Sequence, residues 1–254
     1  MRKLWMLTFA AVVMTGCGNH DEAEQTQPSQ QTADEMKTDT GQKEAASETS
    51  AEGRENSTKE SDFNSEISND WNVTLPINFP VSEGKFLTAV TSKEQDEITF
   101  DFYETDKKLE INDSAIKDSG QYVGQLAVTN YETEEMASEQ IDQTKFSQGE
   151  KVDLGHGITG YQDAGAGSQF TSWNEGRWAL VARSTTEKSE ESAATAKETV
   201  DYLETHSLPI PKPYGQLHMD AEGDSSLAKW QKQNIVYTMT DFGDQTLDWL
   251  VTFK

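Results

Sequence analysis

The sequence has little cysteine and little positive charge. Its 254 residues include one Cys, which excludes an internal disulfide and a Cys-rich zinc site. Asp and Glu number 45 against 21 Lys and Arg, giving a formal net charge of −24. Nucleic-acid binding needs basic patches that replace phosphate counterions, and anionic lipid headgroups attract Lys and Arg clusters. We therefore expect neither a nucleic-acid partner nor direct adhesion to anionic lipid.

The apolar run at the start is too short to cross a membrane. It covers residues 4–14, and Thr8 is its one polar member. A bilayer core of about 30 Å needs roughly 20 apolar residues in a helix. Because Arg2 and Lys3 precede the run, it fits the apolar region of a secretory signal, which is typically about 7–15 residues.

The four residues that follow, Met14-Thr15-Gly16-Cys17, resemble the lipobox of bacterial lipoproteins, although Leu is more usual than Met at the first position. The resemblance implies a diacylglyceryl group on the Cys17 sulfur and cleavage between Gly16 and Cys17. Two acyl chains hold a protein stably on a membrane, whereas one does so only marginally. We expect a signal peptide at 1–16 and a lipid-anchored, exported protein on the outer face of the cell membrane. The alternative is an ordinary secretory leader.

A segment poor in apolar residues follows the leader. Residues 18–62 contain no Leu, Ile, Val, Phe, Tyr or Trp, and they carry twelve acidic and four basic side chains. Such a segment cannot bury enough apolar surface to offset its ordering entropy. We expect a disordered acidic linker over 17–70, with a root-mean-square span of about 40 Å for 45 residues. A long linker is typical of a Gram-positive surface.

Apolar residues recur steadily from residue 71, and 71–254 is long enough for one domain with a substantial core. The order of elements predicts an α+β fold, a largely antiparallel sheet with two helices on one face. Ala193, Ala196, Val200 and Leu203 recur at helical spacing. The predicted helices cover 132–144 and 188–206. The predicted strands cover 85–91, 98–103 with a return through Leu109 and Ile111, 122–131, 152–161, 169–173 and 177–184 as a hairpin, 216–220, 234–241 and 246–253.

No motif in the sequence indicates catalysis. Residues 155–160 (Gly-His-Gly-Ile-Thr-Gly) match a dinucleotide fingerprint as a string, but a loop follows where a helix is required. His20, His156, His206 and His218 lack metal-ligand spacing. There is no Gly-x-Ser-x-Gly elbow, and the single thiol is assigned to lipid. We expect a non-enzymatic protein without catalytic residues, cofactor or metal.

Two further groups of side chains have both a binding and a structural interpretation. Carboxylates alternate over residues 220–224 as calcium ligands do, but the spacing fails the EF-hand rule and favours a solvated turn. Trp173, Trp178, Trp230 and Trp249 are candidates for an aromatic binding surface, with a core role as the favoured alternative.

The hairpin at 170–178, with the strand, Ala-rich helix and Pro-rich segment after it, resembles parts of small extracytoplasmic lipoproteins of Gram-positive bacteria. The resemblance names no domain family and implies no activity. Our leading hypothesis is a membrane-anchored module that binds another envelope component, most directly a protein. The alternatives are a carrier of a small apolar ligand or lipid, and a hydrolase that acts on the envelope.

Overall fold

The computed structural model describes residues 62–68, 71–223 and 225–254. The predicted signal peptide at 1–16, Cys17 and nearly all of the predicted linker at 17–70 lie outside the described residues. The core nevertheless begins before the expected boundary at residue 71. Phe63 and Ile67 are buried within it, and Phe63 packs edge-to-face on Phe102 with ring centroids 5.4 Å apart. The domain boundary is corrected accordingly.

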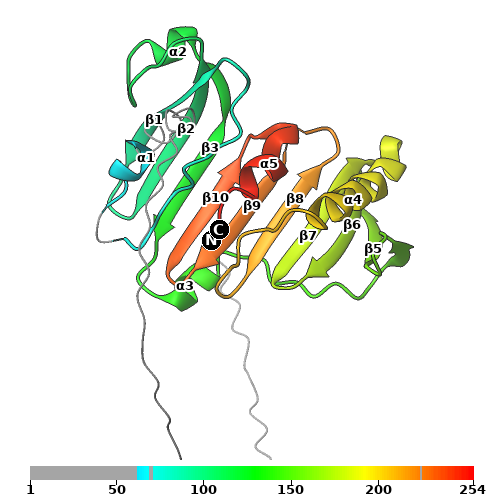
Figure 1. Cartoon of the computed structure of the whole chain (residues 1–254). Helices are drawn as coiled ribbons and strands as arrows, with labels where there is room; N and C mark the ends of the chain where they lie inside the picture. Colours follow the sequence, from blue (N-terminus) through cyan, green and yellow to red (C-terminus); the bar gives the residue numbers. More distant parts are fainter. Residues whose placement is uncertain (1–61, 69–70, 224) are drawn as a thin grey trace, which may run out of the picture. The chain divides into compact units, whose positions relative to one another are not determined.

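Ten strands form one sheet in the order β1-β2-β3-β10-β9-β8-β7-β6-β5-β4 (Figure 1). The strands are β1 Phe86–Lys93, β2 Glu97–Thr105, β3 Gln121–Asn130, β4 Glu150–Asp153, β5 Thr159–Gly165, β6 Ser168–Glu175, β7 Trp178–Thr185, β8 Gly215–Asp220, β9 Leu227–Lys232 and β10 Ile235–Thr240. All pairs are antiparallel except β7 with β8, which a helix joins. The prediction of a largely antiparallel sheet is confirmed, because hairpins link most neighbours.

Five α-helices accompany the sheet in the described residues, rather than the two expected. They are α1 Asp62–Ser65, α2 Ile116–Ser119, α3 Glu134–Ser138, α4 Ser189–Leu203 and α5 Thr246–Leu250, with 3₁₀ turns at Thr186–Lys188 and Gly243–Gln245. The long helix α4 packs on β6, β7 and β8, and α5 packs on β9 and β10. No helix of the described segments has the length and apolar character that crossing a membrane requires.

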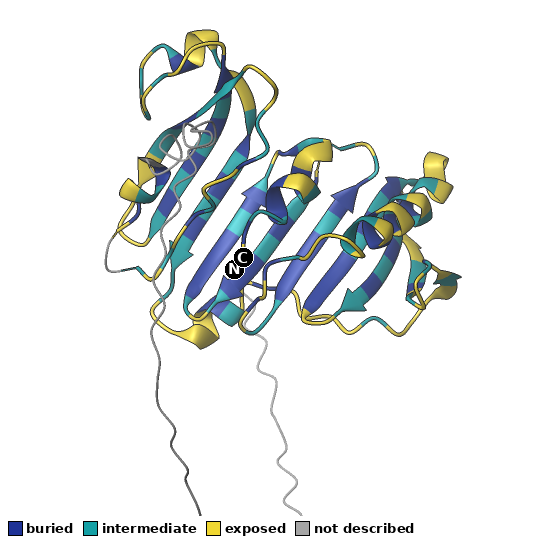
Figure 2. Cartoon of the chain, in the orientation of Figure 1, coloured by how far each residue is buried: buried dark blue, intermediate teal, exposed yellow. Residues whose placement is uncertain are grey.

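Buried and exposed side chains alternate along the strands, and the buried ones form the core. In β2, Phe100 and Phe102 are fully buried, whereas Asp101 between them is half-buried. Figure 2 shows buried stretches along the strands and exposed ones on the helices and loops. Phe102 lies 5.1 Å from Trp249 between ring centroids, and Trp249 lies 4.9 Å from Phe79. A cluster of aromatic rings therefore joins β2, α5 and the segment that precedes β1.

The predicted strand at 246–253 is wrong. Residues 246–250 form α5, in which Thr246, Trp249 and Leu250 are buried. Positions i, i+3 and i+4 lie on one side of a helix, so three neighbouring side chains can enter the same core. The Thr246 hydroxyl donates to the Gly243 carbonyl at 2.7 Å and joins the helix to the turn before it.

Three other predicted elements are also corrected. Residues 109–111 do not form the predicted return strand. The chain instead passes beside β1, where the Asn112 main-chain N–H donates to the Ala89 carbonyl and the Asn112 side chain accepts from the Thr91 N–H. The helix predicted at 132–144 is shorter in the structure, where only α3 is helical. After α3 the chain has to reach β4 at the far edge of the sheet. An extended chain covers more distance per residue than a helix does. The strand predicted at 152–161 is two strands, β4 and β5, with a glycine turn between them.

Candidate functional site

The four tryptophans that the sequence offers as binding residues lie in the core. The exposed fraction is 1% for Trp173, 4% for Trp178 and 0% for Trp230 and Trp249. Trp230 stacks on Tyr237 with ring centroids 4.9 Å apart. Rings enclosed in this way offer no face for stacking on a ligand, so the hypothesis of an aromatic binding surface is corrected to a structural role.

The histidines of the domain do not converge on one point. His156 Nε2 lies 2.8 Å from Asp201 Oδ1, and its Nδ1 lies 3.6 Å from Glu204, so its two nitrogens face different carboxylates. His206 follows α4, and His218 lies half-buried on β8. Within the described residues, no group of three or more His, Cys, Asp or Glu side chains is arranged to hold a metal ion.

Both loop motifs are structural turns. Residues 155–157 all have positive φ and turn the chain from β4 into β5, so no helix follows the glycines as nucleotide binding would require. In the acidic turn, Asp220 is buried and its Oδ2 accepts from Arg183 Nη1 at 2.6 Å. Asp220 is therefore held within the fold, and Asp224 lies outside the described residues.

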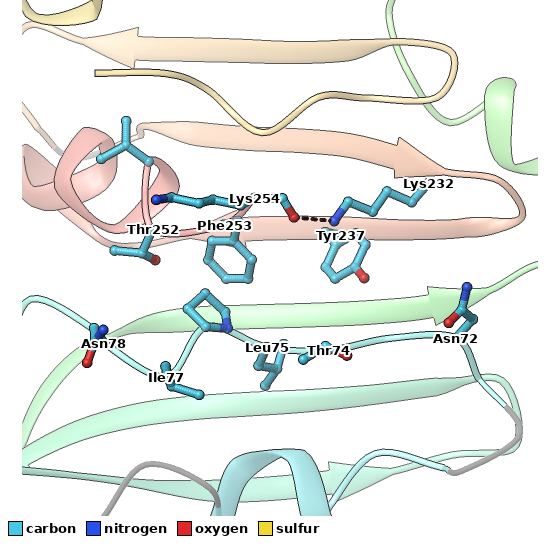
Figure 3. Close-up of a pocket in the computed structure, with 12 residues that line it drawn as sticks. Asn72, Thr74, Leu75, Ile77, Asn78, Lys232, Tyr237, Thr252, Phe253 and Lys254 are labelled. Atoms are coloured by element: carbon cyan, nitrogen blue, oxygen red, sulfur yellow. Dashed lines mark hydrogen bonds between the residues drawn. The ribbon is translucent and has the colours of Figure 1, made fainter. Parts of the chain in front are cut away.

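An elongated groove of about 730 Å³ lies between residues 72–78 and 251–254. We name it the Tyr237 groove, because the buried ring of Tyr237 forms part of its floor. Figure 3 shows Leu75 and Ile77 on one wall and Phe253 opposite, with Lys232 beside Tyr237. The groove is lined by Asn72, Thr74, Leu75, Pro76, Ile77, Asn78, Lys232, Tyr237, Val251, Thr252, Phe253 and Lys254.

The wall at 72–78 is held in place from behind. Asn64 of α1 accepts from the Leu75 main-chain N–H at 2.7 Å and donates to its carbonyl at 3.4 Å. Pro76 follows, which keeps the preceding residue extended. Within the described part of the chain, the main-chain N–H groups of Thr74, Ile77 and Asn78 have no protein acceptor. The residues Thr74, Ile77 and Asn78 are themselves exposed.

Lys232 places a cation at the groove. Its Nζ donates to the main-chain oxygen of Lys254, the last residue of the sequence, at 2.7 Å (Figure 3). Burial, together with the nearby charge of Lys212, lowers the pKa of Lys232 below its usual range. An ammonium carries three donors, and the ion pairs among the described residues do not include Lys232. The main-chain oxygen of Lys254 is therefore the acceptor that the described residues give this ammonium.

No Asp or Glu side chain lines the groove, although the domain is acidic. Residues 71–254 carry 31 acidic and 15 basic side chains, whereas the groove is lined by two Lys and no Asp or Glu. Burial raises the pKa of Tyr237 to about 12, so its hydroxyl stays protonated at neutral pH. The lining is therefore rich in donors and suits a ligand that carries acceptors.

The interface between the long helix and the sheet is filled. Ala196 and Val200 of α4 are buried in the same core as Leu180 and Trp173 of the sheet, with exposed fractions of 1% or less. The carrier hypothesis predicts an apolar pocket at such an interface. A smaller hollow of about 470 Å³ lies instead beside the end of α4, next to the exposed Ile210.

Sequence reasoning did not find this groove. Val73, Leu75 and Ile77 alternate with polar residues and Pro76, but no element is predicted there, and 251–253 falls in the strand predicted at 246–253. The signals available were Pro76 beside an apolar pair and Lys232 without a nearby acidic residue in the chain. The predicted lipid attachment at Cys17, after Gly16, lies outside the described residues. Comparisons with protein-family models, with curated proteins and with solved structures find no match.

Proposed function

We propose that the chain is an exported lipoprotein, anchored through Cys17, whose domain binds another envelope component in the Tyr237 groove. The observation that carries the proposal is an elongated groove, rich in donors and free of Asp and Glu side chains, in an acidic domain. Its volume of about 730 Å³ is within the usual range for ligand sites, roughly 300–1,000 Å³. The component that fits best is a protein, since polypeptide supplies an acceptor at every residue.

The two alternatives have less support. A hydrolase needs titratable groups that converge on the bound substrate, and the titratable side chains lining the groove are Lys232, Tyr237 and Lys254. A carrier of an apolar ligand needs an apolar cavity, and the amides and hydroxyls of this lining would lose their partners around an acyl chain.

Photocrosslinking in cells tests the binding role. A photoreactive residue at Ile77, which is 56% exposed on the groove wall, should capture one discrete envelope component from the full lipidated chain. The same residue at Met136, which is 42% exposed on α3 and does not line the groove, is the matched control. Equal patterns of capture from the two positions would count against the groove as the binding site.

A further inference from the structure

We infer that His156 acts as a pH-dependent latch, which holds the turn between β4 and β5 against α4 more firmly when its imidazole is protonated. The imidazole has a carboxylate at each of its two nitrogens. Nε2 lies 2.8 Å from Asp201 Oδ1, and Nδ1 lies 3.6 Å from Glu204 Oε2. The latch lies outside the Tyr237 groove, so it does not depend on the proposed binding role.

The backbone of the turn fixes the position of the ring. His156 has a φ of 52°, and Gly155 and Gly157 on either side have φ of 89° and 78°. Two main-chain hydrogen bonds close the turn: the Leu154 N–H donates to the Ile158 carbonyl at 3.0 Å, and the Ile158 N–H donates to the Gly155 carbonyl at 2.8 Å. Because Leu154 is buried in the core, the turn is tied to the domain beside the ring.

The end of α4 presents the two carboxylates together. Asp201 and Glu204 are three positions apart, which places them on one side of the helix. A helix C-terminus carries partial negative charge and is stabilised by a cation, yet α4 has no basic residue in its last turn. Protonated His156 places a positive charge at this end of the helix.

Protonation changes what the ring can do at its two nitrogens. A neutral imidazole carries one N–H, so it can donate to one carboxylate while a lone pair faces the other. An imidazolium carries an N–H on both nitrogens and attracts both carboxylates. The ordinary pKa of an imidazole is about 6.5, so the latch should tighten as the pH falls from about 7.5 to about 5.5.

Other charged groups of this region can also respond to pH. Asp153, at the end of β4, accepts from a main-chain N–H of the turn at 3.0 Å. Burial raises the pKa of Glu175 at the end of β6. Lys197 is one helical turn before the two carboxylates on α4 and takes part in none of the ion pairs of the described residues, and His206 stacks on a tyrosine of α4. A variant that changes His156 alone separates the latch from these groups.

Hydrogen exchange at single amides measures the latch. The Leu154 and Ile158 N–H groups are bonded within the turn, so their protection factors report how often the turn opens. They are measured by NMR on the purified full-length chain in detergent at about pH 5.5 and about pH 7.5, with exchange rates corrected for their intrinsic dependence on pH. We expect protection about two- to fivefold greater at the lower pH, because all three side chains of the latch are partly exposed and an exposed ion pair has about this effect.

Variants identify the ring as the origin of this ratio. His156→Asn removes the imidazole and keeps a residue type that tolerates positive φ, so the turn should still form and show equal protection at both pH values. Asp201→Asn should lower the ratio, because the protonated ring then has one carboxylate instead of two. His206→Gln, which removes another imidazole near the end of α4, is the matched control and should keep the wild-type ratio.

Three other results would overturn the latch. Equal protection of the wild-type turn at both pH values would show that the charge of the ring does not hold it. A wild-type ratio that persists in His156→Asn, whatever the level of protection, would assign the pH dependence to Asp153 or Glu175. Loss of the ratio in His206→Gln would assign it to that imidazole instead. None of these outcomes affects the Ile77 crosslinking experiment, which tests the groove separately.

Discussion

Glu175 makes the stability of the fold depend on pH. Burial raises the pKa of its carboxyl group, although the indole N–H of Trp173 donates to it at 2.9 Å and opposes the rise. A raised folded-state pKa means that the ionised form destabilises the fold. This cost is absent at pH values below the unfolded pKa of about 4.3 and grows as the pH rises through the folded value.

Glu175→Gln should therefore increase the free energy of unfolding at pH 7, because the amide oxygen still accepts from Trp173 and carries no charge. Urea unfolding at pH 7 and pH 4 would measure the effect, which should shrink at pH 4. An equal effect at both pH values would show that the charge is not its origin.

His218 makes the stability depend on pH in the opposite direction to Glu175. Burial lowers the pKa of its imidazole, and the charge of Asp142 opposes this only in part. The unfolded chain therefore takes up the proton first as the pH falls below about 6.5, and stability is lost in that range and retained above it. In His218→Gln the loss of melting temperature between pH 7.5 and 5.0 should be smaller than in wild type. Calorimetry would check this, and an unchanged loss would assign it to other groups.

Among the elements, α5 joins most of the aromatic cluster. Trp249 is fully buried and contacts Phe79, Phe102 and Phe242. Removing a buried aromatic side chain leaves a cavity and costs about 3–5 kcal/mol. Trp249→Ala should lower the free energy of unfolding by that amount in guanidinium titrations. Trp71→Ala, at a half-buried tryptophan, should cost clearly less, and equal losses would contradict the assigned role of α5.

The elements that the sequence predicted well are those whose hydrophobic pattern can be read from residues close together in the sequence. β2 and β3 alternate because one face is buried, and α4 repeats its small residues at helical spacing. β9 was not predicted, because Lys229, Gln231 and Lys232 resemble a loop, yet Gln231 is fully buried. Its side-chain amide donates to the Glu134 carbonyl at 2.9 Å, a partner 97 residues away that no local pattern reveals.

The candidate site depends even more on distant contacts. The Tyr237 groove joins a segment that precedes β1 to one that follows α5, and their pairing follows from the path of the chain across the sheet. Residue type made the four tryptophans candidates for binding, with a core role favoured, and the structure shows that all four are buried. The motif at 155–160 is a turn, as predicted, because no helix follows its glycines. The solvated turn predicted at 220–224 is wrong at Asp220, which is buried and paired with Arg183, and Asp224 lies outside the described residues.

The molecule as a whole should depend on one residue for its attachment. Cys17 is the single thiol in the chain, so Cys17→Ala removes the only site for the proposed lipid. We expect most of the variant in the soluble fraction or the medium, and most of the wild type with the membrane. Immunoblots of fractionated cells measure this. Continued membrane association of the variant would overturn the proposed anchor.

The pairing of β3 with β10 ties the middle of the chain to nearly its last residues. Asn234 donates to Asn130, 104 residues earlier, where the two strands meet. Until β10 has left the ribosome, β1 to β3 can form only a three-stranded piece with an open edge. Pairing between strands that are so far apart in the sequence slows folding. Meanwhile the unpaired edge of β3 can pair with strands of other chains. A chain clipped before residue 235 should therefore be prone to aggregation rather than merely inactive.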